Sequence, residues 1–172
     1  MFNKVCIIGC GLIGSSIARS IKKNNLSRKV VSSNRSNITN KKIIKLNIVD
    51  EASSDTKKIV KGSDLIIIAT PLSSYENVIL KIKKSLKKGS ILTDVGSVKE
   101  KVISLIEKNI PKDVSWISSH PIAGTEESGP ESGFAELFKN RWCILTPSSR
   151  AKNQDLKLLE NFWKKMGSKV DI

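Results

Sequence analysis

The sequence contains a single histidine, His120, within residues 119–129, which read SHPIAGTEESG. The mostly apolar run at 114–117 predicts a buried strand just before it, and α/β sheets place their chemistry at the carboxyl ends of such strands. An imidazole can serve there as a general base near neutral pH. Ser97 follows another predicted strand and either donates a hydrogen bond to substrate or caps the next helix. No acidic residue is placed to complete a Ser-His hydrolase.

Residues 9–14 read GCGLIG, directly after a predicted strand and directly before a predicted helix. In that context the GxGxxG spacing predicts a dinucleotide-binding turn. Gly9 permits the tight turn, Gly11 lets the backbone approach a pyrophosphate, and Gly14 lets helix and strand pack closely. The helix N-terminus then offers unpaired N–H groups to the phosphates. The cofactor-binding residues predicted here are Gly9, Gly11, Leu12, Ile13 and Gly14.

The second predicted strand ends at Asn34, Arg35 and Ser36, about 20 residues beyond the glycines. An acidic residue at this point would hold the ribose 2′-hydroxyl of NAD, but here the position is asparagine. Arg35 and the neighbouring hydroxyls could instead bind a 2′-phosphate, which favours NADP. The alternative is that Asn34 still binds the 2′-hydroxyl and Arg35 stacks on adenine, so NAD stays open. Thr70 and Pro71 follow a further buried strand and are also expected to line the cofactor.

Predicted strands and helices alternate along the chain, which indicates an α/β domain with a doubly wound, mostly parallel sheet. The loops at 9–14, 70–73, 94–99 and 119–129 should then meet at the carboxyl edge. The strands are expected at 4–8, 29–33, 48–49, 64–69, 90–93, 114–117, 142–145 and 167–172, and the helices at 15–23, 40–46, 55–60, 74–86, 101–108 and 156–166.

Lysine dominates the charge of the chain. The net charge is +14, but aromatic residues make up only 5% of the sequence, too few for a base-stacking surface. The lysines are scattered along presumed helix faces, so we expect a solvated basic surface and no nucleic-acid partner. Neither a membrane-spanning run nor a signal peptide is visible. The three cysteines form no metal-binding or disulfide pattern, which predicts a cytoplasmic protein without a metal.

Three segments together resemble a known family. GCGLIGS at 9–15, DVGSVK at 94–99 and HPIAGTE at 120–126 are similar to the prephenate/arogenate dehydrogenase (TyrA) family of tyrosine biosynthesis, and FAELF and NRWCILTP at 134–147 are similar too. The resemblance covers nearly the whole chain in order. HPIAGTE and DVGSVK are far more specific than the glycine turn.

The resemblance implies an NAD(P)-dependent enzyme that oxidatively decarboxylates prephenate to 4-hydroxyphenylpyruvate, or arogenate to tyrosine. His120 would take the proton of the ring hydroxyl, and Ser97 would hydrogen-bond that hydroxyl and the imidazole. Thr125 and Glu126 match loop positions near the substrate. Lys99 could hold a phosphate or form an ion pair, and a solvated lysine fits equally well.

The resemblance also implies a helical C-terminal domain, which supplies dimer contacts and an arginine for a substrate carboxylate. Residues 1–172 correspond to the dinucleotide-binding domain alone, and neither Arg141 nor Arg150 matches that arginine. Two other functions stay open. One is a different reductase of the β-hydroxyacid or pyrroline-carboxylate type, which would lack HPIAGTE. The other is a non-catalytic NADP-binding module.

Overall fold

The computed structural model describes residues 1–97 and 100–172, without the side chains of residues 100–103. The strands are β1 (Phe2–Ile8), β2 (Ser27–Ser33), β3 (Glu51–Ser53), β4 (Leu65–Ile68), β5 (Ile91–Asp94), β6 (Ser115–Pro121), β7 (Trp142–Pro147) and β8 (Lys169–Asp171). The helices are α1 (Leu12–Lys23), α2 (Asn37–Lys45), α3 (Thr56–Val60), α4 (Tyr75–Ile82), α5 (Glu100–Asn109) and α6 (Asn153–Lys165), with 3₁₀ turns at η1 (Leu72–Ser74) and η2 (Lys83–Ser85).

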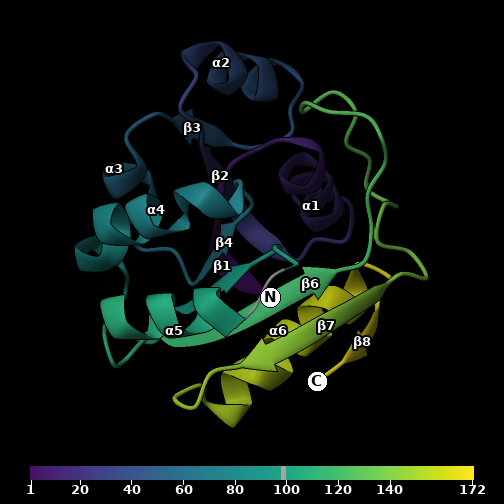
Figure 1. Cartoon of the computed structure of the whole chain (residues 1–172). Coiled ribbons are helices and arrows are strands. Elements are labelled where there is room, and N and C mark those ends of the chain that lie inside the picture. Colours follow the sequence, from purple (N-terminus) through teal and green to yellow (C-terminus); the bar gives the residue numbers. More distant parts are fainter. Residues whose placement is uncertain (98–99) are drawn as a thin grey trace.

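The described strands form one sheet in the order β3-β2-β1-β4-β5-β6-β7-β8 (Figure 1). Neighbours from β3 through to β6 run parallel, whereas β7 pairs antiparallel with β6 and parallel with β8. The strand order reverses on either side of β1, as in doubly wound dinucleotide-binding folds. The predicted Rossmann-type fold with a mostly parallel sheet is therefore confirmed.

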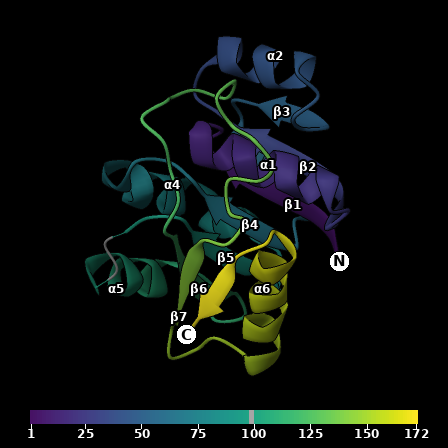
Figure 2. The ribbon, with the colours of Figure 1, turned by 90° about the vertical axis from the view of Figure 1, so that its right-hand side faces the viewer.

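The core has two layers because the central strands are buried on both faces. Val5 and Ile7 of β1 pack into the cluster that holds α1 and α6. Cys6 and Ile8 point the other way, into the cluster that holds α3, α4 and α5. Figure 2, seen from the side, shows these two helical layers with the sheet between them. This sandwich leaves the carboxyl ends of the strands open for a ligand.

Two expectations about strands were wrong in detail. Ile48 and Val49 are buried but lie in a turn, and the strand begins at Glu51, because this edge strand pairs only with β2. The strand expected to end at residue 117 continues through His120 to Pro121. Its extension is paired with β7, a partner distant in sequence. His120 therefore lies within a strand end and not after it.

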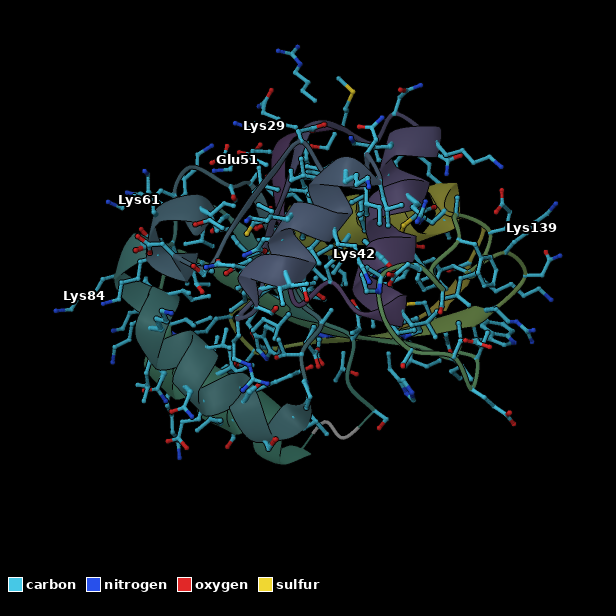
Figure 3. All side chains as sticks on the ribbon, turned by 90° about the horizontal axis from the view of Figure 1, so that it is seen from above. Lys29, Lys42, Glu51, Lys61, Lys84 and Lys139 are labelled. Carbon is cyan, nitrogen blue, oxygen red and sulfur yellow. The ribbon has the colours of Figure 1, made fainter. Side chains whose placement is uncertain are left out.

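Lysines are spread around the surface (Figure 3). The labelled examples come from β2, α2, η2 and two loops, and Lys29 forms an ion pair with Glu51 at 2.8 Å. Among the described residues, no helix is long and apolar enough to cross a membrane. The three cysteines, Cys6, Cys10 and Cys143, are buried and in no disulfide.

Candidate nucleotide site and catalytic edge

The glycine turn joins β1 to α1 in a backbone path that larger residues cannot follow. Gly9 has a φ of +93°, and a Cβ there would lie 2.7 Å from the carbonyl oxygen of Ala69. A Cβ on Gly14 would lie 2.1 Å from the carbonyl oxygen of Gly9, so helix and turn are in direct contact. By contrast, a Cβ on Gly11 would meet nothing within 4 Å. Space is thus left in front of Gly11, at the N-terminus of α1.

A cleft of about 580 Å³ opens at this turn, beside the carboxyl ends of β1, β2 and β4. It brings together seven of the residues predicted from the sequence. Leu12, Ile13 and Gly14 lie in the first turn of α1, outside the lining. The predicted residues that do line the cleft are Gly9, Gly11, Asn34, Arg35, Ser36, Thr70 and Pro71.

Asn34 ties the end of β2 to the glycine turn. Its Oδ1 accepts a hydrogen bond from the Cys10 N–H at 2.6 Å, and its Nδ2 donates to Ser32 Oγ at 3.1 Å and to Asn40 Oδ1 at 3.0 Å. Both amide hydrogens of Asn34 are therefore used within the protein. The side chain shapes the cleft, and its remaining capacity toward a ribose is as an acceptor.

The cleft carries positive charge and hydroxyl groups. Among the residues that the structure describes, its lining includes Arg35 and Lys81 and no aspartate or glutamate. The Cys10 thiol adds no negative charge, since burial raises its pKa to about 12. Ser36 Oγ caps α2 by accepting from the Thr39 N–H at 3.3 Å, so a helix N-terminus also faces this end of the cleft.

Sequence reasoning missed a wall of the cleft that α4 provides. Ser74, Asn77, Val78 and Lys81 all line it. Their spacing of i, i+3, i+4 and i+7 is typical of one helix face, so the sequence did contain a pattern from which this wall could be predicted. Val78 also packs against the cluster beneath α4.

A second wall comes from residues 122–141, a segment without helix or strand that we call the strap. Figures 1 and 2 show it leaving β6, running beside α1 toward α2 and returning to β7. Gly129 and Pro130 of the strap line the cleft. No local pattern in the sequence signals this contribution.

The strap is fastened to the helices beside the cleft. Glu131 forms an ion pair with Lys42 of α2, and the Phe134 N–H donates to Ser16 Oγ of α1 at 3.1 Å. A Cβ on Gly133 would lie 2.1 Å from Ser15 Oγ, which shows how closely strap and α1 approach. The strap thus closes the side of the cleft next to α1 and α2.

Beyond the cleft, the same sheet edge continues to β5 and β6. The 95–97 segment follows β5 and approaches η1, since a Cβ on Gly96 would lie 3.0 Å from Leu72 Cδ2. Ser97 is exposed at this edge, and His120 is half-buried at the end of β6. Because strands lie about 4.8 Å apart, β6 is three spacings, or about 14 Å, from β1. The predicted catalytic residues therefore flank the cleft and do not line it.

The side chain of His120 belongs to one face of β6. Trp116 of the same strand packs into the cluster beneath α4 and α5, and Ser118 bonds to Asp94. Successive side chains in a strand alternate between faces, so His120 points to the same side as these two residues.

The other site residues predicted from the sequence are Thr125, Glu126 and Lys99. Thr125 and Glu126 are exposed in the strap, and Thr125 Oγ1 accepts from the Glu127 N–H at 3.2 Å. Lys99 lies outside the described residues. No group of three or more His, Cys, Asp or Glu side chains suited to a metal occurs in the described part of the chain.

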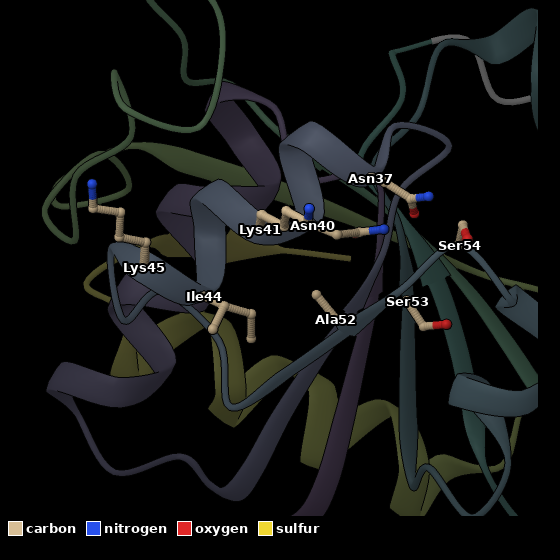
Figure 4. Close-up of a pocket in the computed structure, with 8 residues that line it drawn as sticks. All are labelled: Asn37, Asn40, Lys41, Ile44, Lys45, Ala52, Ser53 and Ser54. Carbon is tan, nitrogen blue, oxygen red and sulfur yellow. The ribbon is translucent and has the colours of Figure 1, made fainter.

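A shallow hollow of about 550 Å³ lies between α2 and β3 (Figure 4). It is lined by Asn37, Asn40, Lys41, Ile44, Lys45, Ala52, Ser53 and Ser54. Asn40 is committed to Asn34, since its Nδ2 donates to the Asn34 carbonyl at 3.2 Å. The hollow therefore lies behind Asn40, the residue that connects α2 to Asn34 in the wall of the cleft.

Comparison with known proteins identifies the family. The family model described as "Prephenate dehydrogenase, nucleotide-binding domain" matches residues 17–172. The chain belongs to this family. It is 34% identical over 172 residues to the cyclohexadienyl dehydrogenase of Zymomonas mobilis, a match that covers 100% of this chain and 58% of that enzyme. The resemblance inferred from DVGSVK and HPIAGTE is thereby confirmed.

Solved structures of prephenate and arogenate dehydrogenases have the same fold. The prephenate dehydrogenase of A. aeolicus, in complex with hydroxyphenyl propionate and NAD+, gives a TM-score of 0.91 at 28% identity, covering 99% of this chain and 59% of that chain. Synechocystis arogenate dehydrogenase gives a TM-score of 0.90 at 27% identity, covering 98% and 58%. The chain thus spans a little over half the length of these relatives.

Proposed function

We propose that the protein containing this chain catalyses the NAD(P)-dependent oxidative decarboxylation of prephenate or arogenate. The chain supplies the nucleotide cleft and the catalytic edge formed by His120 and Ser97. The observation that carries the proposal is the position of His120 on a prephenate dehydrogenase domain, at the strand end next to the dinucleotide cleft. The experiment that tests it is a turnover assay with each substrate, described at the end of the Discussion.

The cleft fits a dinucleotide on structural grounds. The open space before Gly11 at the N-terminus of α1 suits a pyrophosphate, because helix N-termini present unpaired N–H groups to anions. Asn34 to Ser36 lie on the ribose side, and Thr70 and Pro71 form the opposite wall. The strand order then directs the nicotinamide end past β4 and β5 toward His120.

We expect NADP to be preferred over NAD. Arg35 and the N-terminus of α2 surround the end of the cleft at which the 2′-phosphate would lie, and no carboxylate of the described residues lines that cleft to repel it. Asn34 is neutral and already bonded to Cys10 and Asn40. The charge and the donors there therefore match a phosphate better than a hydroxyl.

Replacing Arg35 with alanine should weaken NADP binding by about 10- to 100-fold, the loss expected for one charge-assisted hydrogen bond. Affinity for NAD should change by less than about threefold, since its ribose carries no phosphate. Titration of each cofactor, followed by protein fluorescence, measures both values.

Arg28→Ala is the matched control, because Arg28 is also an exposed arginine but lies at the amino end of β2, whereas Arg35 follows the carboxyl end of that strand. It should leave both dissociation constants unchanged. Equal losses of NADP affinity in the two variants would show that Arg35 acts only through the general positive charge. An Arg35→Ala variant with unchanged NADP affinity would also contradict the assignment.

In the proposed reaction, His120 takes the proton of the ring hydroxyl as that carbon becomes a carbonyl. Ser97 hydrogen-bonds the hydroxyl and the imidazole, which keeps the proton-accepting nitrogen directed at it. NAD(P)+ supplies the hydride acceptor when bound. Loss of carbon dioxide then aromatises the ring, and His120 can return its proton to the phenolate oxygen. Aromatisation makes the step effectively irreversible.

Further parts of the proposal concern the whole protein. We place residues 1–172 in one dinucleotide-binding domain, and we expect a helical domain of the longer protein to supply the carboxylate-binding arginine and the contacts of a homodimer. Thr125 and Glu126 are proposed substrate contacts from the strap. The three buried cysteines, which form no disulfide, agree with the cytoplasmic location that we propose.

A further inference from the structure

The sheet divides between β5 and β6 just before the catalytic edge. The described backbone register of these strands pairs Ile91 with Ser115 and Leu92 with Trp116, near their amino ends. From Ile117 onward β6 is instead paired with β7, through Pro121. The two segments that carry Ser97 and His120 therefore leave the shared ladder before they reach the site.

The carboxylate of Asp94 bridges this division. Its Oδ1 accepts from Ser118 Oγ at 2.5 Å and from the Ser119 N–H at 3.2 Å, both in β6. Its Oδ2 accepts from the Gly96 N–H at 3.0 Å and from the Tyr75 hydroxyl at 3.1 Å. Asp94 is fully buried, at 0% exposure, where such hydrogen bonds are stronger than in water.

Each group held by Asp94 lies next to a proposed catalytic residue. The Gly96 N–H is one residue before Ser97. Ser118 is two residues before His120 and shares its face of β6, and the Ser119 N–H adjoins His120 directly. One carboxylate thus connects the two backbone segments whose separation sets the distance from Ser97 to His120.

We infer that Asp94 is a positioning residue, which holds the Ser97 segment against the end of β6 and so sets the Ser97–His120 geometry for proton transfer. This inference rests on the proposed function. A carboxylate is required because each of its oxygens faces a backbone N–H, that of Ser119 at Oδ1 and that of Gly96 at Oδ2, and an N–H can only donate. The Tyr75 hydroxyl stays protonated and donating, since burial and the Asp94 charge both raise its pKa.

The variant Asp94→Asn tests this role at constant size. Its NH₂ group would face the N–H of Gly96 or that of Ser119, which can only donate, so one of the two segments must shift. In the full-length protein we expect kcat per cofactor-binding site to fall about 10- to 100-fold, because a displacement near 1 Å costs up to about 10²-fold. The dissociation constant of the cofactor should stay within about twofold, since Asp94 does not line the cleft.

Asp155→Asn is the matched control. Asp155 is also a buried carboxylate that accepts from a β6 serine, Ser115 Oγ at 2.5 Å, but at the strand end away from His120. It should lower stability and leave kcat per binding site unchanged. Equal loss of kcat in both variants, or a wild-type kcat in Asp94→Asn, would overturn the inference.

A second variant covers the case in which Asp94→Asn does not fold. Ser118→Ala removes one donor and keeps the carboxylate, so kcat should fall about three- to tenfold while the cofactor still binds. An unchanged kcat in Ser118→Ala would overturn the inference. Turnover by the wild-type protein is measured first. Absence of wild-type turnover would refute the proposed function and the positioning role with it. Normal wild-type turnover together with unaffected variants would refute the positioning role alone.

Discussion

Replacing His120 with asparagine is expected to lower kcat by about 10²- to 10⁴-fold, the usual contribution of a general base. Asparagine keeps a polar side chain of similar reach but cannot accept the proton of the ring hydroxyl. Because His120 lies outside the nucleotide cleft, the dissociation constant of the cofactor should not change. Stopped-flow or steady-state kinetics on the full-length protein, combined with cofactor titration, measures the two quantities separately.

Ser97→Ala serves as the graded comparison for that experiment. It removes one hydrogen bond at the catalytic edge and leaves the base in place, so a smaller loss of about 10-fold is expected. A His120→Asn protein that keeps near-normal kcat would refute the assignment of His120. A loss of cofactor binding in parallel with kcat would mean that the histidine supports the cleft and not the chemistry.

The second large effect concerns the glycine turn, where two similar substitutions should fail in different ways. Gly14→Ala forces a methyl group to within 2.1 Å of the Gly9 carbonyl oxygen, and both are backbone positions that cannot rotate away. Overpacking of this kind typically destabilises a protein by about 1–3 kcal/mol. The midpoint of thermal unfolding should therefore fall by several degrees, with or without cofactor.

Gly11→Ala is expected to leave the unfolding midpoint nearly unchanged. The residue has extended backbone angles that alanine adopts, and its Cβ would meet nothing within 4 Å. That methyl group would instead occupy the space proposed for the pyrophosphate, so cofactor affinity should fall at least about tenfold. Thermal unfolding and cofactor titration on both variants separate the two effects. Unchanged cofactor affinity in Gly11→Ala would contradict the proposed placement of the phosphates.

Those parts of the site that depend on local sequence were predictable. The run from β1 through Gly9, Gly11 and Gly14 into α1 combines a strand pattern, a glycine spacing and a helix pattern within 23 residues. Each of these patterns depends only on residues close together in the chain, and all three predict the same strand–turn–helix unit. The end of β2 at Asn34 could be located because it lies at a set distance from that turn.

The other parts depend on contacts between distant residues. The end of β6 is a strand because β7 pairs with it, so the pattern at 114–117 could not predict that the strand extends past His120. The strap has no periodicity, and its ion pair between Glu131 and Lys42 joins residues far apart in the chain. Ile48 and Val49 show the related limit that an apolar pair predicts burial but not the pairing that makes a strand.

Asp94 illustrates a third kind of limit. Its hydrogen-bond partners come from three different segments of the chain. Only the fold brings Tyr75, Gly96 and Ser118 to one carboxylate. The positioning role that we infer for it could not be read from spacing.

The most direct measurement of the central claim is formation of reduced nicotinamide by the full-length protein, followed by absorbance with NADP+ or NAD+ and either prephenate or arogenate. We predict turnover with at least one substrate, with one reduced cofactor formed for each 4-hydroxyphenylpyruvate or tyrosine released, faster with NADP+ than with NAD+. His120→Asn should bind the cofactor in the same assay without comparable turnover. Tight cofactor binding without turnover of either substrate would contradict the account and favour a non-catalytic nucleotide-binding protein.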